Sequence, residues 1–271
     1  MTQDSTPIIE LKDVRVTYNA RTGSIFKPNK VNAIAGIDLA LMPKETIGIV
    51  GESGCGKSTT ANVMCGLLAP SSGEVLFKGK SVTKRTAADR RRIGRVVSVV
   101  FQDPATALNA RMAVRDQLLD PLLVHKIGTK ESREARVKDL IAMVGLPDSA
   151  LDALPGQLSG GQRQRVAIAR ALSISPDAII ADEPTSALDV SVRAQILNLL
   201  SDLKEELGLS MVFISHDIQT VRYVSDRIVV MNAGKIVESG EAQALLANPR
   251  DAYTKKLLGA APSLLHPPQQ V

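Results

Sequence analysis

Aromatic side chains are scarce in this chain of 271 residues. It contains no tryptophan, three tyrosines and four phenylalanines, which together are 3% of the sequence. Proteins that bind single-stranded nucleic acid stack bases on aromatic side chains interleaved with basic ones. The basic residues here are scattered, apart from a group formed by Arg90, Arg91, Arg92 and Arg95 with no aromatic residue among them. The net charge of +5 would allow a nucleic-acid partner, but we interpret this arginine group as a solvated face and expect no nucleic-acid partner.

Cysteine is as rare, since only Cys55 and Cys65 are present. Two cysteines without metal-ligand spacing exclude a disulfide framework and a thiolate metal centre, and they fit a reducing cytosol. No apolar run approaches the ~20 residues that a bilayer-spanning helix needs, and the first residues lack the basic and apolar regions of a secretory signal. Any membrane association is therefore expected to depend on a partner protein.

Apolar segments of strand length alternate with helical patterns over most of the chain. The strand segments of this kind are residues 46–50, 96–101, 178–181, 211–214 and 227–231. Such alternation predicts an α/β fold with a mostly parallel sheet. Three earlier segments are separated by turns instead of long helices, and they predict a small antiparallel β layer beside it. These segments are residues 8–18, 31–41 and 74–77.

Two stretches have a helical pattern of apolar residues. Between Gln102 and Leu158 only helices are indicated, with one apolar stripe, and this stretch is expected to form an inserted helical subdomain at about residues 103–158. The stripe consists of Val137, Leu140, Ile141 and Val144. A second helix is expected at residues 190–207, with Gly208 just beyond its end. Its core-facing residues are expected to be Ile196, Leu199, Leu200 and Leu203.

Residues 51–59 read GESGCGKST and match the phosphate-loop pattern G-x-x-x-x-G-K-[ST]. The loop lies between an apolar strand segment and a helical pattern that is expected to stop near the turn at residues 70–73. Its main-chain N–H groups and the helix dipole suit a polyphosphate. Lys57 would reach the β and γ phosphates, and the Ser58 hydroxyl would bind Mg²⁺. The expected nucleotide contacts are Gly51, Glu52, Ser53, Gly54, Cys55, Gly56, Lys57, Ser58 and Thr59.

A pair of acids, Asp182 and Glu183, ends the apolar run 178–181. Adjacent side chains of a strand point to opposite faces, so the two acids are expected to have different roles. We assign Asp182 to the Mg²⁺ shell. Glu183, just beyond the strand, is assigned to the attacking water as its orienting or deprotonating group. The alternative is a solvated acidic turn before Pro184.

The segment LSGGQ at residues 158–162 predicts a second helix that begins at an anion-binding end, with Ser159 as its cap. No second lysine loop accompanies it. This surface, formed by Ser159, Gly160, Gly161 and Gln162, would therefore cover a nucleotide held by another subunit. A linker turn is the ordinary interpretation of an isolated Ser-Gly-Gly, but the position shortly before the Asp182 strand favours the helix end.

Taken together, these segments resemble the motifs of ATP-binding cassette (ABC) transporter ATPases, and they stand in the family's order. They are residues 51–58 (Walker A), 101–104 (Q-loop), 158–162 (signature), 178–183 (Walker B), 186–189 (D-loop) and 215–217 (switch histidine). The resemblance covers nearly the whole chain. It implies a phosphate-loop NTPase core as one ABC ATPase domain at residues 1–262, with residues 263–271 as a tail.

The resemblance also assigns roles to individual residues. It implies that Tyr18 stacks on adenine, for which an aromatic face is suited. Gln102 would contact the metal and the attacking water while linking the core to the helical subdomain. His216 would donate a hydrogen bond to the γ phosphate. The other two histidines, His125 and His266, are interpreted as surface groups.

Three segments are similar to the ATPases of peptide and nickel importers. They are residues 21–26, 101–109 and 248–262. The chain departs from that subfamily in having Asp251 and Ala252 where His-Pro is common. It also lacks the cysteine cluster that some members use for iron and sulfur, so no such cluster is expected.

The resemblance therefore implies an ATP- and Mg²⁺-dependent importer subunit, with peptides as the favoured solute and nickel or another small solute as the alternative. Its partners would be transmembrane permeases, a second ATPase subunit of the same or a different sequence and, indirectly, a substrate-binding protein. Its place would be peripheral, at the cytoplasmic face of the cell membrane. A soluble ABC ATPase of nucleic-acid metabolism is the alternative of a different class, although such proteins usually carry two cassettes or long insertions. A small-molecule kinase would share the phosphate loop but has no need for LSGGQ.

Overall fold

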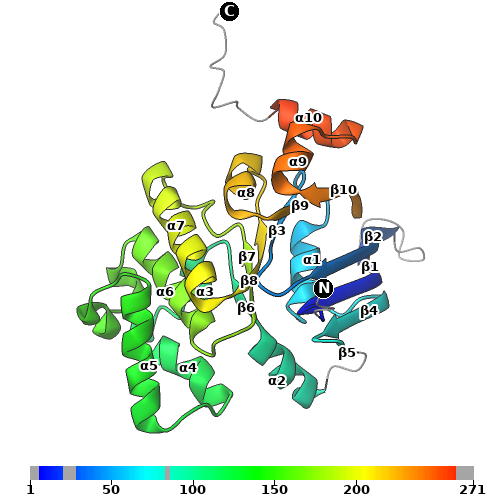
Figure 1. Ribbon diagram of the computed structural model, residues 1–271. Coiled ribbons are helices and arrows are strands. Elements are labelled where there is room, and N and C mark those ends of the chain that lie inside the picture. Colours follow the sequence, from blue (N-terminus) through cyan, green and yellow to red (C-terminus); the bar gives the residue numbers. More distant parts are fainter. Residues whose placement is uncertain (1–5, 21–28, 83–85, 261–271) are drawn as a thin grey trace, which may run out of the picture.

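Two β-sheets and a group of helices make up the computed structural model, which describes residues 6–20, 29–82 and 86–260 (Figure 1). The larger sheet has six strands in the order β10-β9-β3-β8-β7-β6. Its members are β3 (Thr46–Val50), β6 (Val97–Val100), β7 (Ala178–Asp182), β8 (Ser210–Ile214), β9 (Arg227–Asn232) and β10 (Lys235–Glu241). Only the β9–β10 pairing within these residues is antiparallel, and the others are parallel. The predicted mostly parallel α/β sheet is confirmed.

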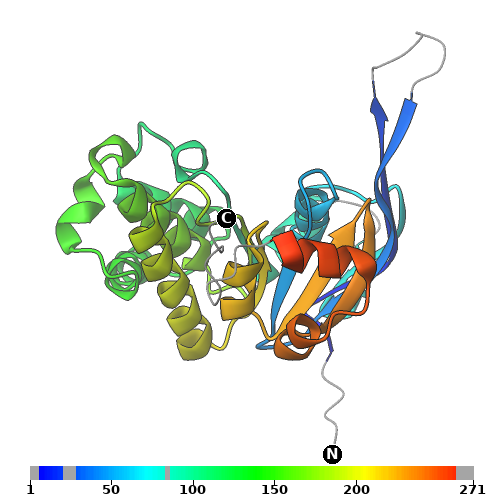
Figure 2. The ribbon, with the colours of Figure 1, turned by 90° about the horizontal axis from the view of Figure 1, so that it is seen from above.

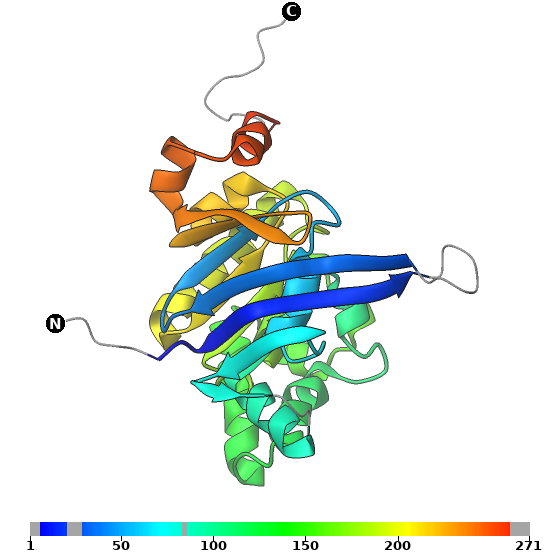
Figure 3. The same cartoon turned by 90° about the vertical axis from the view of Figure 1, so that its right-hand side faces the viewer.

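The smaller sheet is antiparallel throughout its described pairings and has the order β2-β1-β4-β5. It consists of β1 (Ile9–Ala20), β2 (Asn29–Leu41), β4 (Ser72–Phe77) and β5 (Lys80–Ser81). Figure 3 shows this layer in front of helix α1 (Lys57–Met64). Side chains of both sheets and of α1 form one buried apolar cluster, which includes Ile9, Ile49 and Met64. The phosphate-loop helix is therefore held between two sheets.

The chain between β6 and β7 is helical, and Figure 2 shows it to one side of the sheets. Its helices are α3 (Pro104–Ala107), α4 (Val114–Val124), α5 (Lys130–Met143), the short 3-10 helices η1 (Asp148–Asp152) and η2 (Pro155–Gln157), and α6 (Gly160–Leu172). The predicted stripe of Val137, Leu140, Ile141 and Val144 is fully buried. This arrangement agrees with a helical subdomain at residues 103–158, and the division into such a unit stays a prediction.

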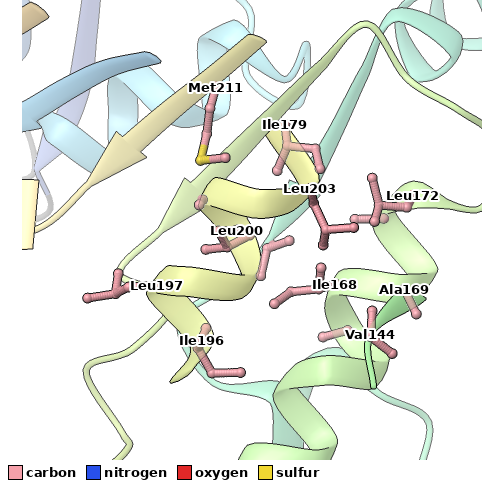
Figure 4. Close-up of a cluster of buried hydrophobic side chains, with 14 of the residues drawn as sticks. Val144, Ile168, Ala169, Leu172, Ile179, Ile196, Leu197, Leu200, Leu203 and Met211 are labelled. Atoms are coloured by element: carbon pink, nitrogen blue, oxygen red, sulfur yellow. The ribbon is translucent and has the colours of Figure 1, made fainter. Parts of the chain in front are cut away.

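Helix α7 (Val190–Leu207) packs against α6 and the sheet, as Figure 4 shows. Gly208 adopts φ 63 and ends the helix, as predicted. Ile196, Leu200 and Leu203 are buried as expected. Leu199 is only partly buried, whereas Leu197, which was not predicted to face the core, is buried. The reason is that α7 contacts neighbours on two sides, so its buried stripe is wider than one row of residues.

Two predicted boundaries were wrong. The strand expected at residues 96–101 is shorter, because Val96 is still the last residue of helix α2 (Ala87–Val96) and Phe101 lies beyond the strand. The helix after the phosphate loop ends at Met64 instead of near residue 70. Gly66 has φ +67 there, and the next two main-chain N–H groups turn back to the Asn62 carbonyl.

The chain ends with α8 (Ile218–Val224), α9 (Ala242–Ala247) and α10 (Ala252–Ala260). In the described parts of the chain, no helix combines the length and the apolar character that crossing a membrane would take. The 21–26 segment, His266 and the predicted tail at residues 263–271 lie outside the described residues.

Candidate functional site

The predicted site residues follow neighbouring parallel strands at the edge where those strands end. Ile49 of β3 pairs with Ile214 of β8, Ile214 pairs with Asp182 of β7, and Val100 of β6 pairs with Ala181. The register therefore brings the carboxyl ends of β3, β8, β7 and β6 level with one another. The segments that follow them meet at this edge, which is where α/β sheets bind ligands.

The loop between β3 and α1 is tightly folded. Gly56 has φ 111, and a Cβ there would lie 2.5 Å from the carbonyl oxygen of Ala33. Only glycine fits this position, because the backbone conformation is left-handed and β2 lies against it. The N–H of Gly234 in the β9–β10 turn donates to the Cys55 carbonyl at 2.9 Å and braces the loop from another side. No local motif indicates the contribution of Ala33.

Lys57 is the first residue of α1, and its side chain is buried inside the loop, with 6% of the residue exposed. Its Nζ donates to the carbonyl oxygens of Gly51 at 2.7 Å and Glu52 at 3.0 Å. The Cys55 sulfur is 3.9 Å away. Carbonyl dipoles solvate the ammonium group without neutralising its charge, so the loop presents a buried positive charge that favours an anion.

An oxygen-rich cluster lies beside Lys57. The Ser58 hydroxyl donates to Oδ1 of Asp182 at a long distance of 3.5 Å. Burial raises the pKa of the Asp182 carboxyl, the Ser58 hydrogen bond opposes this rise, neighbouring Glu183 adds to it, and Lys57 opposes it. A desolvated carboxylate beside a hydroxyl is a hard oxygen donor set of the kind that Mg²⁺ prefers, and a cation would relieve the desolvation. The residues therefore fit the predicted metal.

Glu183 lies directly after strand β7, as predicted. It adopts φ 48, while its N–H donates to the Ile214 carbonyl at 2.9 Å. A glutamate in the left-handed region is strained, and such strain is held by the surrounding structure. One carboxylate oxygen, Oε1, lies 3.2 Å from Nδ1 of His216, which follows strand β8.

These side chains line one pocket of ≈ 420 Å³. Its lining residues come from β2, the phosphate loop and the ends of β6, β7 and β8. They are Ala33, Ser53, Gly54, Gly56, Lys57, Ser58, Thr59, Gln102, Glu183 and His216. The structure thus brings together the loop, Gln102, Glu183 and His216. Gly51, Glu52, Cys55 and Asp182 adjoin the same site through their contacts with Lys57 and Ser58.

Tyr18 is not brought to this pocket. It lies near the end of β1, pairs with Val31 of β2 and is 44% exposed. Its exposed ring is available to a ligand, but Tyr18 is not among the residues that line the Lys57 pocket.

The LSGGQ segment also lies elsewhere. Ser159 caps α6 as predicted, because its Oγ accepts from the Gln162 N–H at 3.2 Å and its own N–H donates to Oε1 of Gln162 at 2.9 Å. None of the residues 159–162 lines the Lys57 pocket. The starts of α1 and α6 therefore do not line the same pocket within one molecule.

One residue beside the loop was missed by sequence reasoning. The hydroxyl of Tyr253 in α10 accepts from the Glu52 N–H at 2.9 Å. Tyr253 belongs to the tail segment noted for its resemblance to importer ATPases, but the sequence carries no local signal that joins residues 201 positions apart.

Comparisons with known proteins agree with this arrangement. A model of the family described as ABC transporter matches residues 34–186. The chain is similar to the probable D,D-dipeptide transport ATP-binding protein DdpF of Escherichia coli K12, with 46% identity over 97% of this chain and 82% of the relative. It is also similar to the oligopeptide transport ATP-binding protein AppF of Bacillus subtilis 168, with 44% identity over 94% of this chain and 78% of the relative.

Among solved structures, the fold resembles the dimeric post-hydrolysis state of the ATP-binding cassette MJ0796 bound to ADP and Pi. The TM-score is 0.76 and the identity is 31%, over 86% of this chain and 98% of that chain. Family match, relatives and fold agree with the site geometry. This chain belongs to the ABC transporter family and is an ATPase cassette of that family.

Proposed function

We propose that this chain is the ATP-hydrolysing subunit of a peptide importer and that it works as one of a pair of cassettes. The observation that carries the proposal is the pocket in which Lys57, Gln102, Glu183 and His216 meet. The relatives, which are named as dipeptide and oligopeptide transport proteins, support peptides as the solute.

The phosphate loop would hold the nucleotide mainly through its main chain. The N–H groups of residues 51–59 and the start of α1 offer donors and a positive dipole to the phosphates. The Lys57 ammonium group has three N–H donors. It would donate to the β and γ phosphates, whose charge makes them stronger acceptors than a carbonyl, and would keep the Gly51 carbonyl as its third partner. Tyr18 would stack on adenine at the outer end of β1.

Ser58, Asp182 and Gln102 would hold Mg²⁺, through hydroxyl, carboxylate and amide oxygens. When bound, the ion would neutralise phosphate charge that develops during hydrolysis. Ionised Asp182 needs such a positive neighbour, because its carboxyl is desolvated. Gln102 lies two residues beyond the end of β6 and would connect this corner of the site to the helices between β6 and β7.

Glu183 would orient the attacking water and accept its proton, while the water oxygen forms a bond to the γ phosphorus and ADP departs. His216 would donate a hydrogen bond to the γ phosphate. In this structure its Nδ1 faces the Glu183 carboxylate, so the pair would be separated by the phosphate and water that enter between the two strand ends.

The second half of the clamp would come from another subunit. Residues 159–162 do not line the chain's own pocket, and Ser159 caps a 13-residue helix whose dipole suits an anion. Two ATP molecules would thus bridge two subunits, of the same or of different sequence. Contacts to the γ phosphate exist only before hydrolysis, so ATP favours the closed pair and hydrolysis reopens it.

Permeases would receive this motion at a groove beside Gln102. The groove of ≈ 320 Å³ lies between β6 and the helices, and its lining includes Phe101, Pro121 and Arg170. His125 also lines it and is half-buried, with its Nδ1 enclosed, so the interpretation of His125 as a surface group was wrong. Attachment there would place the chain at the cytoplasmic face of the membrane, with a substrate-binding protein as an indirect partner.

The variant Glu183→Gln tests the proposal. Purified wild-type protein should release phosphate from Mg²⁺-ATP without any acceptor, which distinguishes an ATPase from a kinase. The variant should bind ATP, scarcely hydrolyse it and accumulate closed dimers that light scattering can detect. Normal hydrolysis by the variant would show that Glu183 is not the base. A wild-type protein that stays monomeric with Mg²⁺ and an uncleavable ATP analogue would exclude the clamp.

The solute needs a separate experiment. Cells that lack the gene should lose uptake of labelled di- or oligopeptide and recover it with the wild-type gene but not with Glu183→Gln. Loss of nickel uptake with normal peptide uptake would instead favour nickel as the solute. Normal uptake of both, combined with a defect in nucleic-acid metabolism, would favour the soluble class of ABC ATPase.

A further inference from the structure

We propose that Tyr253 is a positioning residue for the ATP site, because its hydroxyl holds the peptide unit between Gly51 and Glu52 in the orientation that receives Lys57. The inference rests on the proposed ATP site and adds to it a residue from the C-terminal helix α10. It also gives α10 a part in nucleotide binding, although α10 contributes no residue to the pocket lining.

One peptide unit of the phosphate loop is held by hydrogen bonds at both its N–H and its C=O. Its N–H, on Glu52, donates to the Tyr253 hydroxyl at 2.9 Å. Its carbonyl, on Gly51, accepts from Nζ of Lys57 at 2.7 Å. A trans peptide is planar, and its N–H and C=O point in opposite directions. An acceptor that fixes the N–H therefore also fixes the direction of the carbonyl that the lysine contacts.

Tyr253 is itself well anchored. The Glu238 carboxylate of β10 accepts from the N–H groups of Arg250 at 2.8 Å and Asp251 at 3.1 Å. The Asp251 carboxylate accepts from the Tyr253 N–H at 2.7 Å. The next residue, Thr254, is fully buried. The start of α10 is thus fixed to the edge of the large sheet, and the tyrosine ring projects to the loop from a rigid base.

A second contact joins α10 to the loop, but it is weak. Nζ of Lys256 lies 3.7 Å from Oε1 of Glu52, and the two side chains are 75% and 60% exposed. Exposed ion pairs of this kind contribute little because water screens them. Of the two contacts from α10, the hydrogen bond of Tyr253 is therefore the one that constrains the main chain of the loop.

Removal of the hydroxyl would leave the Glu52 N–H without this acceptor and would free the peptide unit to rotate. The Gly51 carbonyl would then be less well aligned with Lys57, and the loop would be less ordered before nucleotide binds. Glu183 and His216 follow strands β7 and β8, and the Tyr253 hydrogen bond is made to Glu52 instead of to either of them. The loss should therefore affect nucleotide binding much more than the chemical step.

The test is Tyr253→Phe in the full-length chain, with steady-state hydrolysis of Mg²⁺-ATP as the readout. We expect KM to rise about fivefold, the equivalent of roughly 1 kcal/mol for one hydrogen bond, with kcat changed by less than about twofold. Tyr223→Phe is the matched control, because the Tyr223 hydroxyl makes a hydrogen bond to Asn198 at 2.8 Å in α7, away from the loop. Lys256→Met tests the ion pair, and both controls should keep the wild-type KM.

An unchanged KM in Tyr253→Phe, or a fall in kcat alone, would overturn the inference. If the wild-type protein bound no ATP, the proposed function would fail first, so the two failures are distinguishable. Amide hydrogen exchange of the wild-type protein provides a measurement that does not depend on the folding of a variant. The Glu52 N–H should be protected without nucleotide, and rapid exchange there would also overturn the inference.

Discussion

Nδ1 of His216 lies 3.2 Å from Oε1 of Glu183, and this contact joins the ends of two neighbouring parallel strands. The two side chains differ in exposure, since 64% of the His216 side chain is accessible and only 19% of the Glu183 side chain. Glu183 has a left-handed backbone at φ 48, and both side chains line the pocket. The histidine is therefore the member of the pair that can turn toward a bound phosphate.

The variant His216→Ala should separate catalysis from stability. Loss of the γ-phosphate donor is expected to lower kcat by about a hundredfold or more, the usual size of such a contribution. The free energy of unfolding should change by no more than ~0.5 kcal/mol, because the side chain is mostly exposed. Phosphate release and chemical denaturation measure the two quantities. Hydrolysis at the normal rate would remove His216 from the mechanism.

Asp182 should lower the free energy of unfolding at neutral pH when Mg²⁺ is absent. Burial raises the pKa of its carboxyl in the folded state. The folded protein then binds this proton more tightly than the unfolded chain does, so the free energy of unfolding falls as the pH rises from the usual aspartate value through the raised one. Above that range the ionised carboxylate carries its full penalty.

The variant Asp182→Asn removes this charge and retains the shape. In a chelating buffer at pH 7 it should melt at a higher temperature than the wild-type protein, and the difference should shrink as the pH falls through the raised pKa. Mg²⁺-ATP should stabilise the wild-type protein more than the variant. Thermal denaturation measures all three comparisons, and a lower melting temperature for Asp182→Asn at pH 7 in chelator would contradict the argument.

The sequence predicted which residues lie together at the candidate site where this depends on strand order and on local motifs. Residues 51–59, Asp182 and His216 each follow a short apolar segment, and parallel pairing brings such segment ends together. Contacts between segments that are far apart in the sequence could not be predicted. The exchange of Leu199 for Leu197 in the α7 core depends on which neighbours surround the helix, and the Tyr253 contact depends on how α10 folds back over the loop. Tyr18 was assigned by resemblance alone, and its contact with adenine stays a prediction.

Two glycines of the phosphate loop allow backbone strain to be separated from steric contact. Gly54 has φ +80 and Gly56 has φ +111, but a Cβ at Gly54 would meet nothing within 4 Å, whereas one at Gly56 would lie 2.5 Å from the Ala33 carbonyl. Gly54→Ala should lower the free energy of unfolding by roughly 1–2 kcal/mol through strain alone.

Gly56→Ala should cost a further ~1–3 kcal/mol, because β2 or the loop must move to admit the methyl group. Urea denaturation of both variants without nucleotide measures the difference. Equal losses would mean that the loop can move away from β2 at no cost, and that the close approach of Gly56 to Ala33 does not fix the loop.

Ser159 offers a variant that changes function but preserves the helix cap. Its Oγ accepts from the Gln162 N–H, and an aspartate can make the same contact, since Asp and Ser are comparable caps. Ser159→Asp should therefore keep the wild-type stability to within ~0.5 kcal/mol. Its negative charge would, however, face the γ phosphate of the partner's nucleotide. The variant should bind ATP, fail to dimerise and fail to hydrolyse ATP.

A mixture of variants then tests whether the two halves of the site belong to different molecules. Lys57→Met removes the phosphate-loop charge but leaves residues 159–162 intact. Ser159→Asp changes the segment 159–162 but leaves the Lys57 charge in place. Each variant alone should be inactive. In a mixed dimer, the intact loop of one molecule faces the intact LSGGQ segment of the other, so one complete site forms and part of the hydrolysis returns. If both halves of each site came from the same molecule, the mixture would stay as inactive as its components, because neither chain would hold a complete site.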